Sequence, residues 1–149
     1  MNRDFKLNAG ALALALEWEF ADLKEIIEWA DKYILRSDAP ELEIIDLSLS
    51  KNTMEAIRYL NIIKGPFDKW TILRKFFGRF KETHILSVKN ACDLSWQLYK
   101  LIEFAEYVPK DLKQLTLYSD DFDLALNGIN GTPEFRAAEL LKDIKRLSI

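Results

Sequence analysis

Apolar residues recur at helical spacing along most of this chain, with polar residues between them. The clearest case is residues 22–35, where Leu23, Ile26, Ile27 and Ala30 fall on one helical face and the charged residues fall elsewhere. Similar spacing is found in residues 52–64, 68–80, 88–107 and 132–147, and the Ala- and Leu-rich residues 7–16 favour a helix by propensity. The pattern predicts an all-α fold.

Helix-capping and turn residues separate these segments. Asn52 with Glu55 forms a capping-box pattern, and Thr132 followed by Pro133 is typical of a helix start. Gly65 falls where one apolar pattern ends. We find neither an internal repeat nor a long linker, so we expect residues 1–149 to form one domain, a bundle of six or seven helices with short loops.

Residues 42–50 admit two interpretations. Ile45, Leu47 and Leu49 alternate with polar residues, as in a half-buried strand. A strand needs a partner, and the other candidates, residues 84–88 and 114–118, are short. We therefore favour a helix that breaks near Leu49.

The segment 88–107 is apolar on more than one face. Leu94, Leu98 and Leu101 lie along one side, and Trp96 and Tyr99 lie on its flanks. A helix with apolar residues all round is usually buried. We expect this helix to run through the middle of the fold.

Composition indicates a folded protein of the cytoplasm. The 149 residues are 49% hydrophobic and 30% charged, which is ordinary for one globular domain. The single Cys92 cannot form an internal disulfide and fits a reducing compartment. No apolar run approaches the roughly 20 residues that cross a bilayer, so we expect no membrane association.

Residues for catalysis are few. The chain has one histidine, His84, and one cysteine, Cys92, and neither stands in a recognisable motif. A phosphate-binding loop, zinc-ligand spacing and a nucleophile elbow are all missing from the sequence. Asp120, Asp121 and Asp123 lack the glycine and distal glutamate of a calcium loop. We therefore expect a protein that is not an enzyme and that needs no cofactor or metal.

One spacing supports an alternative. Arg79 is followed after four residues by His84, which is similar to the arginine–histidine pair of the all-helical HEPN ribonucleases. In that family the pair acts on the RNA backbone. This chain departs from the pattern at Phe80, where the family prefers a polar residue. The resemblance implies acid–base chemistry that would need His84 exposed beside Arg79.

Charge is distributed unevenly. Residues 17–46 contain ten acidic and three basic residues, a net charge of −7, whereas residues 51–81 contain eight basic and two acidic ones, or +6. These charges either belong to solvated helix faces or form a surface that attracts a basic partner. An acidic surface repels nucleic acid, so we expect a protein partner.

The first third of the chain resembles small helical immunity proteins of bacterial polymorphic toxin and contact-dependent growth inhibition systems. The residues that carry the resemblance are Trp18, Glu19, Phe20, Asp22, Ile26 to Asp31, Pro40 and Ile44 to Ser50.

The resemblance implies a cytoplasmic antidote that binds one toxin domain, commonly a basic nuclease, and blocks its active site. The acidic residues expected to imitate phosphate are Glu25, Glu28, Asp31, Glu41 and Glu43. Trp29 or Tyr33 could anchor the interface centre. A regulatory or structural adaptor is the other non-enzymatic alternative.

Overall fold

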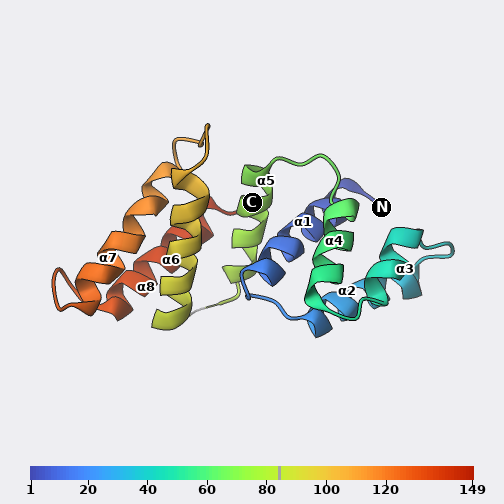
Figure 1. The fold of residues 1–149 in the computed structure, drawn as a ribbon, viewed down its shortest axis with the longest axis horizontal. Helices are drawn as coiled ribbons and strands as arrows, with labels where there is room; N and C mark the ends of the chain where they lie inside the picture. The colour runs from blue at the N-terminus through green and yellow to red at the C-terminus, as the bar shows by residue number, and fades with distance from the viewer. Residues whose placement is uncertain (84) are drawn as a thin grey trace. The chain divides into compact units, whose positions relative to one another are not determined.

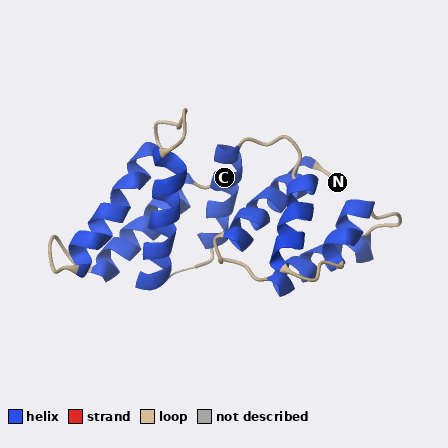
Figure 2. Ribbon diagram, in the orientation of Figure 1, coloured by secondary structure: helices blue, strands red, loops and turns tan. Residues whose placement is uncertain are grey.

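The computed structural model describes residues 1–83 and 85–149, and every regular element in these ranges is helical (Figure 2). The α-helices in them are α1 (Arg3–Glu17), α2 (Leu23–Arg36), α3 (Leu42–Ser48), α4 (Thr53–Ile63), α5 (Lys69–Phe77), α6 (Val88–Glu103), α7 (Leu117–Leu126) and α8 (Pro133–Leu147). Two short 3₁₀ helices, η1 (Gly78–Phe80) and η2 (Lys113–Thr116), complete the described elements. The prediction of an all-α fold is confirmed.

The described residues contain eight α-helices, one more than the upper predicted number. The additional helix is α7. For this part of the chain the sequence indicates turn residues and a short strand candidate at residues 114–118. The positive φ angles of Gly128, Asn130 and Gly131 show that those turns follow the helix and do not replace it. Residues 114–118 themselves belong to η2 and the start of α7.

Residues 42–50 form the predicted helix. α3 ends at Ser48, and Leu49 is its C-cap, with its backbone N–H donating to carbonyls of the last turn. Ile44 and Leu47, three residues apart, are both fully buried. The apolar residues of this segment thus serve one helical face, and the strand interpretation is wrong.

The chain divides into two compact units, residues 1–76 and 77–149. Each contains buried apolar side chains of its own. Whether the two units unfold together as one domain stays a prediction.

In the first unit, α1 packs against α4, and α3 packs against both α2 and α4 (Figure 1). Small residues of α1 allow this packing, since Ala9 and Ala13 lie in the core with Leu12 and Leu16. The same core includes Ile26 and Ala30 of α2, Ile44 and Leu47 of α3, and Ala56, Leu60 and Ile63 of α4. Burying each Leu or Ile contributes about 1.5–3 kcal/mol to the stability of such a unit.

A glycine fixes the approach of α1 to α5. Gly10 is buried in the middle of α1, and a Cβ atom there would lie 3.0 Å from Cγ1 of Ile72. Any side chain at this position would force Ile72 to move. Gly10 therefore costs helix propensity but permits close packing.

In the second unit, α6, α7 and α8 lie side by side and each packs against the other two (Figure 1). Leu94 and Leu98 of α6, Phe122 of α7 and Leu140 of α8 are among the buried side chains. η2 packs beside α6 and buries Leu115.

The expectation that α6 runs through the middle of the fold is wrong. The helix ends at Glu103, and Trp96 is 52% exposed. α6 is therefore buried on one face only, because α7, α8 and η2 leave its other side uncovered.

Candidate functional site

The predicted partner-binding residues lie on α2, on α3 and in the loop between them. Asp22 begins α2 by accepting a 2.9 Å hydrogen bond from the backbone N–H of Glu25. The helix then runs to Arg36, and after the loop at residues 37–41 the chain turns back as α3, which packs against α2. Both helices face the core with apolar residues, so their charged side chains are turned outward.

Besides Asp22, which caps α2, four carboxylates of this hairpin are exposed. They are Glu28, Asp31, Asp38 and Glu43, which we call the acidic surface. Within the part of the chain that the structure describes, none of the four makes an ion pair with a basic side chain. Their charges are thus available to a partner.

The exposed side of α2 is not uniformly acidic. Lys24, Lys32 and Arg36 are exposed on the same helix. The excess of acidic residues seen in the sequence is therefore not an entirely acidic surface on α2, which exposes both acidic and basic side chains. α3 and the preceding loop, residues 37–48, contain acidic side chains and no basic ones.

Glu41 belongs to an internal cluster. Its carboxylate accepts a 2.9 Å hydrogen bond from the Tyr33 hydroxyl and lies 3.0 Å from the N-terminal ammonium of Met1. A hydrogen bond from its own backbone N–H, followed by those from the ammonium and from Tyr33, lowers the pKa of Glu41. The hydrogen bond to Glu41 raises the pKa of Tyr33. These contacts join α2, the start of α3 and the chain's N-terminus.

The two aromatic residues proposed as anchors pack within the first unit. The ring of Trp29 stacks on Phe5 of α1, with centroids 4.3 Å apart and planes 12° apart. The ring of Tyr33 packs against the same phenylalanine, with ring centroids 4.4 Å apart. Both are half-buried against the core, so only part of each side chain is available to a partner. Glu25 is also half-buried and is engaged within the chain.

Two leucines that the sequence did not single out flank the loop between α2 and α3. Leu35 is 85% exposed and Leu42 is 68% exposed. Helical phase could have identified Leu35, because it lies nine positions after the buried Ile26, which places it about 180° away around the helix. An exposed apolar pair beside carboxylates matches the apolar centre and polar rim of protein interfaces.

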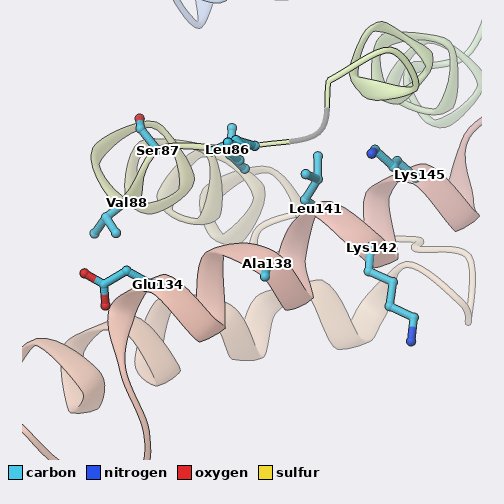
Figure 3. Close-up of a pocket in the computed structure, with 9 residues that line it drawn as sticks. Leu86, Ser87, Val88, Glu134, Ala138, Leu141, Lys142 and Lys145 are labelled. Carbon is cyan, nitrogen blue, oxygen red and sulfur yellow. The ribbon is translucent and has the colours of Figure 1, made fainter.

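The second unit contains a groove of about 500 Å³ between the start of α6 and one face of α8. Figure 3 shows Leu86 and Leu141 beside the groove and Lys142 directed away from them. Glu134 and Lys145 lie near its two ends, and Ser87 in its wall caps α6 by accepting a hydrogen bond from Asn90. The groove can hold an apolar group, and its described lining includes no cysteine or histidine.

The residues proposed for catalysis are only partly described. His84 lies outside the described residues, so the Arg79–His84 hypothesis stays untested. Cys92 is half-buried on α6, and burial, followed by the nearby charges of Asp93 and Asp123, raises the pKa of its thiol. A raised pKa disfavours the reactive thiolate.

The structure describes Asp120, Asp121 and Asp123 as residues of α7. Nowhere in the described ranges do three or more His, Cys, Asp or Glu side chains gather so as to hold a metal ion. No helix in the described ranges has the length and apolar character to cross a membrane.

Fold and site together define a small all-helical protein with an acidic helical hairpin and an exposed leucine on each side of the hairpin's loop. Comparison with family models, curated proteins and solved structures finds no match to this chain.

Proposed function

We propose that this chain is an immunity protein that neutralises a basic toxin domain by binding it through the α2–α3 hairpin. The observation that carries the proposal is the acidic surface: Glu28, Asp31, Asp38 and Glu43 are exposed and make no ion pair within the described chain. The sequence resemblance in residues 18–50 covers the same hairpin.

Complementary charge explains how such a surface would act. Carboxylates that are not neutralised within the protein attract lysine and arginine residues of a partner and speed the encounter. A nuclease that binds phosphate presents such residues at its active site. Leu35 and Leu42 would then contribute apolar contact at the centre, and the hairpin would cover the toxin's active site.

The proposal predicts that charge on the hairpin controls toxin binding. The test is coexpression with the toxin domain encoded beside this chain's own gene, together with measurement of the affinity of the purified pair. The variant Glu28→Gln/Asp31→Asn/Glu43→Gln should weaken binding about tenfold or more, mainly by slowing association, and should lose protection of growth. Added salt should weaken the wild-type complex and should affect the variant less.

A matched control has the same change of charge elsewhere. Glu106→Gln/Asp123→Asn/Glu134→Gln alters three exposed carboxylates of the second unit. Equal weakening by both triple variants would show that net charge, and not the hairpin, determines binding. Absence of any binding to the toxin domain would refute the proposal, and RNA cleavage that is lost in His84→Ala would support the nuclease alternative instead.

A further inference from the structure

The uncovered side of α6 carries one regular stripe of exposed residues. The stripe consists of Lys89, Asp93, Trp96, Lys100 and Glu103, and all five side chains are exposed. Their spacing alternates between four and three residues, which keeps them on one face along the whole helix. The opposite face carries the buried residues of α6 and packs against α7 and α8.

Trp96 is held as a flat platform at the middle of the stripe. Its ring stacks on Tyr99 with centroids 5.6 Å apart and planes 13° apart, and the ammonium of Lys100 lies 5.7 Å from the ring centre. A tryptophan that is half exposed leaves a large apolar area in water, and tryptophan is enriched among the residues that dominate protein interfaces. This geometry indicates a contact surface.

When two copies of the stripe run in opposite directions, each charged residue of one copy faces a residue of opposite charge in the other. In an antiparallel second copy centred on Trp96, Lys89 faces Glu103. To within one residue, or about 1.5 Å of helix rise, Asp93 likewise faces Lys100. A parallel arrangement would place each charge against the same charge. The charges of the stripe therefore favour a second copy of the same helix, packed antiparallel, over a parallel copy.

We propose that α6 is a homodimer interface in which the α6 helices of two copies pack antiparallel through this stripe. The arrangement has two-fold symmetry, so each of the two charge pairs forms twice around a central pair of Trp96 rings. This interface lies on the second unit and is separate from the acidic surface proposed to bind a toxin.

Exposed apolar residues at both ends of α6 support the same pairing. Phe104 is 80% exposed and Tyr107 is 72% exposed, just beyond the last turn of the helix. Antiparallel packing brings this end beside the first turn of α6 in the other copy, where Ile85 is exposed. The dimer would thus cover apolar area that each copy alone leaves in water.

Charge exchange within one chain tests the proposal. Analytical ultracentrifugation of the full chain should show a concentration-dependent dimer, and Asp93→Lys should weaken it about tenfold because two lysines then face each other. Asp93→Lys/Lys100→Asp should restore the dimer. Residues 93 and 100 are seven positions apart, about 10 Å along the helix, so the rescue has to occur between molecules.

Three further measurements complete the test. Asp120→Lys makes the same change of charge on the exposed side of α7 and should leave the dimer unchanged. Lys100→Asp alone should repeat the loss seen with Asp93→Lys, and Trp96→Ser should also weaken the dimer. A wild-type protein that stays monomeric up to about 1 mM, a double variant without rescue, or an equal loss in Asp120→Lys would overturn the proposal.

Discussion

At the scale of single residues, the contact between Tyr118 and Asp143 joins two helices of the second unit. The hydroxyl of Tyr118 on α7 donates a hydrogen bond to the carboxylate of Asp143 on α8, and Arg146 lies 3.5 Å from the same carboxylate. Tyr118 is buried, and burial, followed by its bond to Asp143, raises the pKa of the phenol above its usual range. The folded state thus favours the neutral phenol.

We expect Tyr118→Phe to lower the free energy of unfolding by about 1–2 kcal/mol at neutral pH, because Asp143 loses a donor. The pKa of Tyr118 is higher in the folded state, so this contribution is fully present below about pH 10 and is lost as the pH rises further. Urea unfolding at neutral and alkaline pH should show a steeper alkaline loss in the wild type than in the variant. Tyr107→Phe, at an exposed position, is the control. It should change neither the free energy of unfolding at neutral pH nor its loss at alkaline pH.

At the scale of elements, six of the eight described α-helices begin at polar side chains that accept backbone hydrogen bonds, and α3 and α7 do not. Asn2, Asp22, Asn52, Ser87 and Thr132 each accept from the N–H three residues later. Asp68 accepts from two N–H groups at the start of α5, and the bonds from Thr71 lower its pKa. These contacts are local, which explains why Asp22, Asn52 and Thr132 could be recognised in the sequence.

The cap of α8 gives the prediction at this scale. The Oγ1 atom of Thr132 accepts a 3.1 Å hydrogen bond from the N–H of Phe135. Thr132→Ala should therefore destabilise the protein by about 1 kcal/mol, whereas Thr132→Ser, which keeps the oxygen, should have a smaller effect. Chemical unfolding measured by circular dichroism provides the comparison. Equal stability of the Ala and Ser variants would show that the cap does not contribute.

At the scale of the whole molecule, the open question is whether residues 1–76 and 77–149 unfold together. The tryptophans report on this, because Trp18, Trp29 and Trp70 belong to the first unit and Trp96 to the second. In Trp96→Phe, tryptophan fluorescence follows the first unit alone, while circular dichroism follows the helices of both.

The single-domain prediction requires the two signals of Trp96→Phe to change at the same denaturant concentration, since one cooperative domain unfolds in one transition. Trp96 is exposed within one copy, so the fold of the monomer should tolerate the substitution even where the proposed α6 dimer is weakened. Separate midpoints would mean that the units are independent domains. The far-UV spectrum of the variant, compared with that of the wild type, serves as the control for folding.

The helical class, most helix positions and the negative charge of residues 17–46 could be predicted from the sequence. These properties follow from contacts between residues three or four positions apart and from capping residues at helix ends. α7 was not predicted because its apolar pattern is short and the Asn-Gly turns that directly follow it are the stronger local signal. α6 was placed wrongly because periodicity shows which residues share a face but not whether another helix covers it.

Which of the predicted site residues are available to a partner depends on the packing of the helices and could not be predicted from the sequence. Glu41 and Glu43 look alike in the sequence, yet the first is held by Tyr33 and the N-terminus and the second is exposed. Trp29 likewise packs on Phe5, which lies 24 residues earlier. Side chains so far apart in the sequence meet only when whole helical faces pack together. Local spacing does not show which faces these are.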